Sequence, residues 1–499
     1  MSESRSMIII GAGIGGLSAG CYAQMNGYRS QIFEMHNLPG GVCTAWKRQG
    51  YLFDGCIHHL AGCSEGSKLH AMWEELGLLP HPVHYPEELI AVENSEGRRF
   101  TVYTDLDRLE AHMLELSPGD AKPIQEFVGA ARRFKGLRMM DLVLAKPWEM
   151  LKLLPYIPLM GKWGKVTLEK YGERFSDPFL RRAFGMINYD FENVPAIVAL
   201  MFLAGCATGD FGWPEGGSPE IAGAIEQRYR ALGGEIHYRS RVERILVEKD
   251  RAVGVRLADG SEHRADVVIS NADGYTTIFE MLEGSYADER IRTYYENPPE
   301  RQEMSLHVGL GVDRDLSDLP HALVLWLPEP VRIADALRDR LYLQFYGFAP
   351  EVSPAGKSTV QALFTSGSAH WKALASDRAR YREEKERVAR TVIEQLDRRF
   401  PGLAGQVEVI DVATPLTTER FVGSHLGYQA WMVPDQSAMD FLSGKGLSPT
   451  LPGLDNFRMV GQWAGGLGLP NVAAMGRKAI QAQCKEDGRR FTASSRIVK

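Results

Sequence analysis

Short apolar runs and helical stripes alternate at the start of the chain. Residues 7–10 are apolar and mostly β-branched, which is typical of a buried parallel strand. Apolar residues then recur at helical spacing until Gly27, and residues 30–33 form a second β-like run that ends at Glu34. The pattern predicts a β-α-β unit that opens a parallel sheet.

The middle of the chain, from residue 65 to 210, has mainly helical periodicity, clearest in LHAMWEELGLL and DAKPIQEFVGAARRFKGLRMMDLVL. Its most apolar stretch, residues 142–163, is interrupted by charged residues and prolines. This stretch therefore cannot cross a bilayer as one apolar helix.

Strands and helices are mixed in the second half. A helical stripe over residues 221–232 is followed by three short β-like runs. Residues 276–445 hold both kinds of element without a strong signature, and the charged run RARYREEKERVARTVIEQLDRRF reads as an exposed helix face. The chain closes with a predicted strand over 457–460, a glycine-rich loop over 461–468 and a helix from 471 to 483.

The glycines of the first turn carry a chemical signal. Gly11, Gly13 and Gly16 form G-x-G-x-x-G between the first strand and its helix, and Glu34 follows 23 positions after Gly11. A helix N-terminus offers free N–H groups to a pyrophosphate only where the backbone allows close approach, which glycine does. The acid then accepts hydrogen bonds from a ribose. The arrangement predicts an adenine dinucleotide site.

Composition narrows the partners. The chain has 499 residues, 44% of them hydrophobic and 24% charged, with a net charge of −6, so we expect two structural units and no nucleic-acid partner. The six cysteines form no C-x-x-C pair, and no signal peptide or metal motif is recognised. We therefore expect free thiols, a cytoplasmic location and no metal site.

The segment after Glu34 resembles a known family. It contains P-G-G and then a G-Y-x-F-D-x-G arm, as in the flavoprotein superfamily of amine oxidases, phytoene desaturases, carotenoid isomerases and retinol saturase. The resemblance implies FAD as cofactor. Many relatives have a basic residue directly after the glycine pair, where this chain has Val42, so we expect the phosphate contact to come from the backbone or from Lys47 or Arg48.

Two later regions extend the resemblance. In relatives, the strand that begins at Val242 passes the adenine end of FAD, and the VVISNAD strand returns to the first sheet. The closing strand, loop and helix lie under the flavin, where a helix N-terminus stabilises negative charge. The match is closer to the desaturase and isomerase branch than to amine oxidases. The predicted FAD contacts are Gly11, Gly13, Ile14, Gly15, Gly16, Glu34, Gly40, Gly41, Val42, Thr44, Val242, Asn271, Gly461, Gln462, Gly468, Pro470, Asn471 and Val472.

The expected fold is therefore α/β, with a Rossmann-like FAD-binding domain of parallel sheet interleaved with other units. These are a mixed β-sheet substrate domain and a helical lid or membrane-facing region. By residue number, we assign 1–64, 212–275 and 446–499 to the FAD-binding domain, 65–211 to the lid and 276–445 to the substrate domain.

The resemblance implies an oxidoreductase that desaturates, saturates or isomerises C=C bonds of a long apolar isoprenoid polyene. No second G-x-G-x-x-G follows a strand, so we expect an external electron acceptor or donor, such as quinone, oxygen or a reductant. Two other hypotheses stay open. One is a flavin amine oxidase acting on a small or lipophilic amine, and the other is an FAD-binding protein without catalysis.

Proton exchange needs a titratable side chain beside the flavin. In relatives, the chain that leaves the G-Y-x-F-D arm runs towards the flavin ring, and here that segment is GCIHHLAG. Imidazole titrates near neutrality, so His58 and His59 are the catalytic candidates. Adjacent positions of an extended segment point to opposite sides, so we expect only one of the two to face the substrate.

A membrane surface is a second expected partner. Between Arg132 and Arg182, about 12 basic residues and about five acidic ones flank the apolar stretch. Basic flanks around apolar residues are typical of segments that enter a membrane face. A lid over a substrate pocket explains the pattern equally well, so peripheral association with the inner membrane face is one of two expectations.

Overall fold

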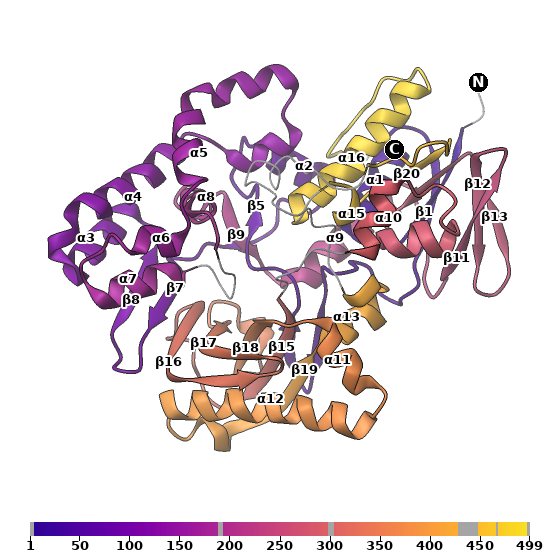
Figure 1. Cartoon of the computed structure of the whole chain (residues 1–499). Coiled ribbons are helices and arrows are strands. Elements are labelled where there is room, and N and C mark those ends of the chain that lie inside the picture. The colour runs from indigo at the N-terminus through magenta and orange to yellow at the C-terminus, as the bar shows by residue number, and fades with distance from the viewer. Residues whose placement is uncertain (1–3, 188–192, 298–303, 428–447, 466–467, 497–499) are drawn as a thin grey trace.

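The computed structural model in Figure 1 describes residues 4–187, 193–297, 304–427, 448–465 and 468–496. Parts of the predicted substrate domain, residues 298–303 and 428–447, and of the last glycine-rich loop, residues 466–467, lie outside the described residues. The described elements gather into a parallel-sheet unit, a second unit built on a larger sheet, and a group of helices (Figure 1).

The first unit is a five-stranded parallel sheet with strand order β10-β2-β1-β14-β20. Its central strand, β1, pairs on one side with β2 and on the other with β14. Because β14 is the VVIS run, this run does return to the first sheet as predicted. The apolar β-branched run thus occupies the most buried place in the sheet. The strands are β1 Ser6–Ile10, β2 Arg29–Phe33, β10 Glu235–His237, β14 Val267–Ser270 and β20 Phe457–Met459.

Three helices pack on this sheet through one apolar core. Leu17 and Tyr22 of α1 meet Ile225 of α9 and Ala473 of α16 there. The helices are α1 Ile14–Met25, α9 Gly217–Ala231 and α16 Leu469–Glu486. A smaller antiparallel sheet, the helical turn η4 and two helices complete the unit. They are β11 Val242–Glu248, β12 Arg251–Leu257, β13 Glu262–Arg264, η4 Thr276–Met281, α10 Glu289–Glu296 and α15 Gln462–Gly465.

The second unit is a seven-stranded sheet with strand order β19-β15-β18-β17-β16-β7-β8. Apolar residues of its strands meet Val388 and Val392 of α12 in one core. The strands are β7 Glu88–Glu93, β8 Arg99–Tyr103, β15 Met304–Val312, β16 Ala322–Ile333, β17 Ala336–Phe345, β18 Ser358–Thr365 and β19 Val407–Ala413. Its other helical elements are η5 Pro350–Val352, α11 Ser368–Ala375, α12 Arg378–Arg399, η6 Leu403–Gln406, α13 Pro415–Val422 and η7 His425–Gly427.

One part of this sheet differs from the sequence-based expectation. The segment 65–210 was expected to be mainly helical, yet β7 and β8 come from it and extend the sheet along β16. Residues 89–92 are a short continuous apolar run and residues 99–102 alternate polar and apolar positions, on either side of a turn at residues 94–97, which is typical of two strands. The hairpin is short, so the helical periodicity of the residues on both sides of it conceals the two strands when a long stretch of sequence is considered.

Helices cover the other face of the large sheet, at the upper left in Figure 1. Phe127 of α4 and Leu203 of α8 pack there against Val102 and Val324 of the sheet. The elements are α3 Leu106–Leu116, η1 Pro118–Asp120, α4 Ala121–Phe134, η2 Met139–Leu144, η3 Pro147–Tyr156, α5 Ile157–Trp163, α6 Leu168–Gly172, α7 Pro178–Gly185 and α8 Ala196–Cys206. The preceding helix, α2 Lys68–Glu75, packs instead through Leu69 and Trp73 in the core of the first unit. Within the described residues, these and the other helices are each too short or too polar to span a bilayer.

Short strands connect the units. The G-Y-x-F-D arm is β4, which pairs with β3 in a hairpin. β9 pairs with both β5 and β6. These strands are β3 Ala45–Arg48, β4 Tyr51–Asp54, β5 Leu60–Ala61, β6 Val83–His84 and β9 Phe211–Pro214.

Candidate functional site

The turn between β1 and α1 has the shape that the glycine motif predicts. A Cβ atom on Gly16 would lie 2.1 Å from the carbonyl oxygen of Gly11, so only glycine lets the helix start this close to the strand. No side chain caps the N-terminus of α1 at Gly13. The first N–H groups of the helix, which include those of Ile14 and Gly15, are therefore available to an anion.

Glu34 stands at the carboxyl end of β2 and is 7% exposed. Its Oε2 accepts a hydrogen bond of 2.7 Å from the N–H of Ala12, and its Oε1 accepts one of 2.7 Å from the N–H of His36. Each oxygen keeps a second lone pair for a ribose hydroxyl. The segment before Val242 lies beside it, because the N–H of Ser240 donates to the carbonyl oxygen of Glu34 at 2.8 Å.

The segment after Glu34 closes over the glycine turn. Gly40 forms a β-bridge with Gly13, and its N–H donates to the carbonyl of Ala12 at 2.9 Å. A Cβ on Gly41 would lie 3.4 Å from the Cα of Gly13. The structure therefore brings Gly40 and Gly41, with the adjoining Val42 and Thr44, to the edge of the predicted phosphate site.

Asn271 joins the first and last parts of the predicted FAD site. Cβ atoms on Gly13, Gly15 and Gly461 would each lie between 2.5 and 2.7 Å from its side-chain amide. The amide is thus packed between the first glycine turn and the turn that follows β20. Asn271 was predicted from the resemblance, and its packing explains why Gly15 and Gly461 lack side chains.

The closing helix also reaches this edge. The first turn of α16 follows Gly468 and has Pro470 near its start, where no side chain caps it. A Cβ on Gly476 would lie 2.5 Å from the carbonyl oxygen of Gly15, so α16 crosses α1 in close contact. Gln462 begins the short helix α15, and Asn471 and Val472 lie in the first turn of α16.

The residues present fit an FAD molecule. The glycine cradle, the two uncapped helix N-termini and the Glu34 carboxylate match the pyrophosphate, the flavin and the ribose of such a cofactor. The sequence left Arg48 as a candidate phosphate contact. Its guanidinium instead binds Asp411 at 2.9 Å and so points to β19. Lys47 is exposed on the same hairpin strand. The backbone N–H groups are left as the main phosphate donors.

Asp54, the acid of the G-Y-x-F-D arm, shapes the loop that carries the two candidate histidines. It is 4% exposed, and its Oδ1 accepts hydrogen bonds from the N–H groups of Cys56 and Ile57 and from the hydroxyl of Ser218 at 2.7 to 3.1 Å. Its Oδ2 accepts the N–H of Ser218 at 2.8 Å. Burial raises the pKa of Asp54, and these hydrogen bonds oppose that rise. The carboxylate therefore ties the histidine loop to the start of α9.

His58 and His59 are in this loop, where it meets the large sheet. Nδ1 of His58 is 2.5 Å from Nε2 of Gln344 on β17, whereas the ring of His59 packs against His321 with centroids 5.8 Å apart. The two histidines thus meet different neighbours. Removal from water, together with the nearby His321 and His307, lowers the pKa of His58 to about 3. Removal from water also lowers the pKa of His321 to about 4.

Aromatic side chains surround this group. The ring of Trp213 on β9 lies 5.6 Å from those of Tyr346 and Phe348, and His321 lies 4.7 Å from Phe348. The hydroxyl of Tyr346 donates to Gln361 at 2.6 Å. Sequence reasoning missed Trp213, His321, Gln344, Tyr346 and Phe348. They stand singly at strand ends in three separate parts of the chain, so no motif marks them.

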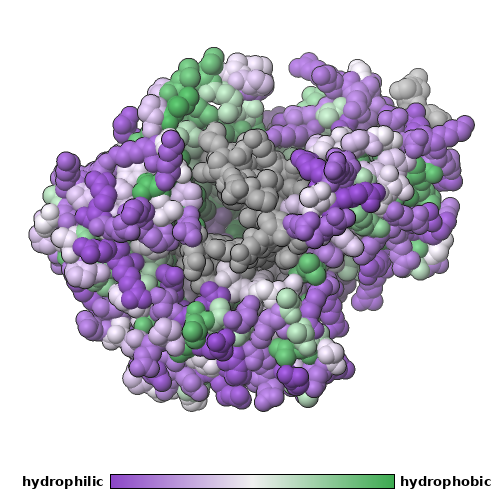
Figure 2. Space-filling view, viewed as in Figure 1, coloured by the Kyte–Doolittle hydropathy of each residue, from purple (hydrophilic) through white to green (hydrophobic). Residues whose placement is uncertain are grey.

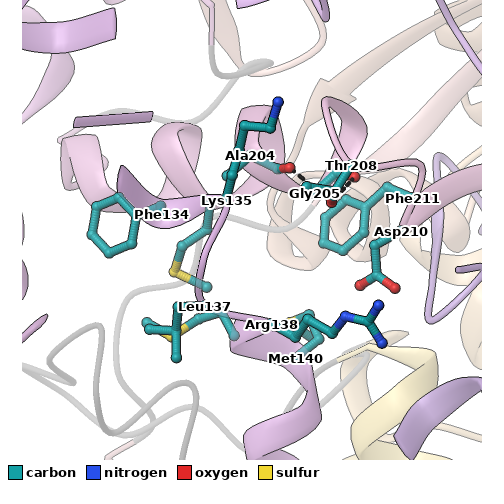
Figure 3. A pocket seen from close by; sticks show the side chains of 12 residues that line it. Phe134, Lys135, Leu137, Arg138, Met140, Ala204, Gly205, Thr208, Asp210 and Phe211 are labelled. Carbon is teal, nitrogen blue, oxygen red and sulfur yellow. Dashed lines mark hydrogen bonds between the residues drawn. The ribbon is translucent and has the colours of Figure 1, made fainter. Parts of the chain in front are cut away.

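Two clefts lie among the covering helices. Figure 3 shows the first, with the Asp210 carboxylate and the Arg138 guanidinium on one side among methionine, leucine and phenylalanine side chains. The hydroxyl of Ser64 donates to Asp210 at 2.6 Å. Burial raises the pKa of Asp210. Phe211 in this lining lies two residues before Trp213 on β9, and the ring of Trp213 contacts that of His321. The cleft therefore adjoins the histidine group.

A family model described as flavin containing amine oxidoreductase matches residues 14–401. The chain is 27% identical over 460 residues to prolycopene isomerase of Arabidopsis thaliana, covering 84% of this chain and 73% of that protein. It is 25% identical over 499 residues to the neurosporene-forming phytoene desaturase of Cereibacter sphaeroides, covering 90% and 92%.

The fold is also found among solved structures. An oxidoreductase from Methanosarcina mazei superposes with a TM-score of 0.57 at 18% identity, covering 95% of this chain and all of that one. At this identity the likeness concerns the fold, and it agrees with the α/β architecture predicted from the sequence.

Proposed function

The chain belongs to the family of flavin containing amine oxidoreductases, and from that membership we propose that it forms, removes or rearranges C=C bonds in a long apolar polyene. The protein is an FAD-dependent oxidoreductase. FAD, when bound, accepts or supplies a hydride at the flavin ring. The chain's own residues hold the cofactor, exclude water and orient the polyene.

One observation carries the substrate class. A narrow cleft lies between the large sheet and helices α4 and α8, and every lining side chain is apolar. Such a lining favours contact with hydrocarbon and offers no side-chain partner to a polar group. The lining residues are Leu89, Ile90, Val102, Phe127, Ile187, Ala199, Phe202 and Leu203.

Two further observations support a long substrate. The ring of Phe202 in the apolar cleft lies 5.2 Å from Phe211, which lines the cleft of Figure 3. The two clefts are thus separated by one pair of rings. The names of the Arabidopsis and Cereibacter relatives describe an isomerase and a desaturase of polyenes. Desaturation requires an external acceptor of the quinone or oxygen class, and saturation requires a donor.

A flavin amine oxidase is the second candidate, and the aromatic group favours it. Trp213, Tyr346 and Phe348 place their rings 5.6 to 6.2 Å apart beside His321. Aromatic faces of this kind receive the nitrogen of an amine. The apolar cleft favours the polyene over the amine as substrate, because a small amine would make no contact that requires it.

Anaerobic reduction of the bound flavin tests the function. We expect phytoene in phosphatidylcholine vesicles to bleach the flavin of the holoenzyme, or prolycopene to change its geometry once the flavin is chemically reduced. Benzylamine and putrescine should leave the flavin oxidised. Bleaching by an amine but not by either polyene would establish the second candidate, and inertness towards all four would point to an FAD-binding protein without catalysis.

A patch of exposed apolar side chains supports membrane association. Five of the ten exposed large apolar residues in the described part of the chain lie on η3 and at the start of α5, and the hydrophobic group at the upper edge of Figure 2 covers this region. Lys146 and Lys162 flank it. We call it the apolar patch: Trp148, Met150, Leu151, Leu154 and Ile157. Apolar side chains between lysines suit an anionic bilayer surface, from which a polyene enters without crossing water.

Flotation tests this surface. With the holoenzyme at low salt, we expect the protein to float with vesicles that contain anionic lipid. The double change Leu151→Glu and Leu154→Glu should leave most of it at the bottom, because two charges must then enter the interface. Leu337, 64% exposed on β17, offers the control, and Leu337→Glu should float like the parent. A parent protein that stays at the bottom would show that the segment is a lid and does not bind membranes.

A further inference from the structure

Three imidazoles meet where the loop after β4 reaches the end of the large sheet. His58 and His59 belong to the loop, and His321 directly precedes β16. The rings of His59 and His321 pack edge to face with centroids 5.8 Å apart. Trp213 and Phe348 contact His321 at 6.2 and 4.7 Å, so its ring has little room to move. His59 therefore has a fixed imidazole neighbour from a distant part of the chain.

Hydrogen bonds assign the proton on two of these rings. Nδ1 of His321 lies 3.3 Å from the carbonyl oxygen of Phe345, so this nitrogen carries a hydrogen. Nδ1 of His58 accepts from the amide Nε2 of Gln344 at 2.5 Å. The hydroxyl oxygen of Tyr346 lies 3.2 Å from Oε1 of the same amide, but its single hydrogen has a closer acceptor in Oε1 of Gln361 at 2.6 Å. Both rings are held as neutral tautomers by their neighbours.

His59 is held differently. Its Nδ1 is sealed from solvent and finds no hydrogen-bond partner among the residues that the structure describes, whereas Nε2 is not sealed. A proton that arrives at Nε2 makes the ring a cation whose N–H at Nδ1 is unpaired and out of water. Removal from water, together with His321 and His58, lowers the pKa of His59 well below its ordinary value. Protonated His59 is therefore a stronger acid than an ordinary imidazolium.

We propose that His59 exchanges a proton with a substrate carbon through Nε2, and that His321 is a positioning residue that fixes the His59 ring and keeps it neutral between turnovers. This inference rests on the proposed function. It also chooses between the two histidines, which the sequence leaves as nearly equal candidates for the proton exchange. The lone pair of His58 at Nδ1 already accepts a hydrogen bond from Gln344.

The electrons and atoms balance in both directions. When a C=C bond forms, one carbon loses a hydride, whose electron pair passes to the oxidised flavin. The neighbouring carbon loses a proton to the lone pair of Nε2, and the electron pair left behind becomes the second bond of the C=C. In the reverse direction the proton returns from Nε2 and the hydride from the reduced flavin.

Neutral His59 is a weak base and its imidazolium form is a strong acid, and both properties suit proton exchange with a polyene carbon. A carbon beside a conjugated cation releases its proton readily, so a weak base is sufficient. A neutral polyene accepts a proton only from a strong acid, which an ordinary imidazolium is not. The environment of His59 favours both steps, because it disfavours the imidazolium form.

Deuterium exchange tests the proton step on the holoenzyme. In D₂O with phytoene or prolycopene in vesicles, His59→Gln should slow deuterium entry into the polyene by about 100-fold or more. FAD content should not change. His84 on β6 provides the control, because it also packs against Phe348, at 5.7 Å, and His84→Gln should stay within about threefold of the parent. Equal exchange in the His59→Gln variant and the parent would overturn the assignment.

Imidazole titration followed by NMR tests the positioning role without substrate. With ¹³C-labelled histidine, the resonance lost in His59→Gln should show no midpoint near pH 6.5 in the parent holoenzyme. The titratable groups that act on it are His321 and His58, and His58 is in turn affected by His307 on β15. His321 lowers the pKa of His59, so His321→Asn should move the midpoint up towards 6.5, and His321→Phe, which keeps an aromatic ring, should do the same.

The two measurements separate the two levels of inference. If neither polyene reacts but the NMR result is as expected, the proposed function fails and the paired histidines stand. A parent midpoint near 6.5, or a midpoint unmoved by both changes at His321, overturns the pairing whatever the substrate proves to be.

Discussion

Replacing Asp54 by Ala should lower the free energy of unfolding by about 3 to 5 kcal/mol. The change leaves the N–H groups of Cys56 and Ser218 without their acceptor, in a place where water has little access, and leaves that of Ile57 with only the hydroxyl of Ser218 at 3.2 Å. Each buried donor without a partner costs about 1 to 3 kcal/mol, and a water molecule in the vacated volume recovers part of the loss. Urea unfolding of the holoenzyme measures the effect.

Two variants sharpen the Asp54 experiment. Asp54→Asn keeps one carbonyl oxygen for three of the donors but turns an NH₂ group towards the N–H of Ser218, so we expect about half the loss. Asp105, the exposed N-cap of α3, also accepts two backbone N–H groups, and Asp105→Ala should cost only about 1 kcal/mol. If Asp54→Ala costs no more than Asp105→Ala, the carboxylate does not organise the histidine loop.

Replacing Gly16 by Ala should weaken FAD binding by about tenfold to 100-fold, or about 1.4 to 2.8 kcal/mol. The new Cβ would meet the carbonyl oxygen of Gly11 at 2.1 Å, and a backbone atom cannot turn aside as a side chain can. The helix must therefore move away from the strand, and its first N–H groups move with it. Quenching of flavin fluorescence on titration of the apoprotein gives the affinity.

The matched control for this change lies in α4. Gly129 has no heavy atom within 4 Å of the position that a Cβ would take. Gly129→Ala should leave FAD affinity unchanged and raise the free energy of unfolding by about 0.5 to 1 kcal/mol, since alanine favours a helix more than glycine does. An affinity for FAD within about threefold of the parent in Gly16→Ala would show that the close approach at Gly11 is not needed.

The parallel sheet was predictable because its signals are local. The apolar run of β1, the glycine turn and Glu34 are contiguous in sequence, and period and spacing are sufficient to identify them. Asn271 depended on the resemblance alone. The pairing of β7 with β16 was missed, because strand partnership between residues 91 and 323 has no signal in either segment by itself.

The histidine group shows a different limit. His58 and His59 were found because they follow a recognisable arm. His321 and Gln344 are single residues at the ends of β16 and β17, and only tertiary packing brings them to the loop. A sequence shows which side chains are able to titrate, but the neighbours that set the tautomer and the pKa come from the fold.

The order β10-β2-β1-β14-β20 also affects how the protein is made on the ribosome. The sheet begins near residue 6, yet its last strand starts at Phe457, roughly 190 residues after β14 ends at Ser270. At a synthesis rate of about 5 to 20 residues per second, the open edge of β14 waits about 10 to 40 s for its partner. During that interval an apolar parallel strand is exposed to other nascent chains. We therefore expect yield in a heterologous host to improve with added chaperones that cover the open edge until β20 is made. A C-terminal truncation before Phe457 should give insoluble protein, not a smaller functional flavoprotein.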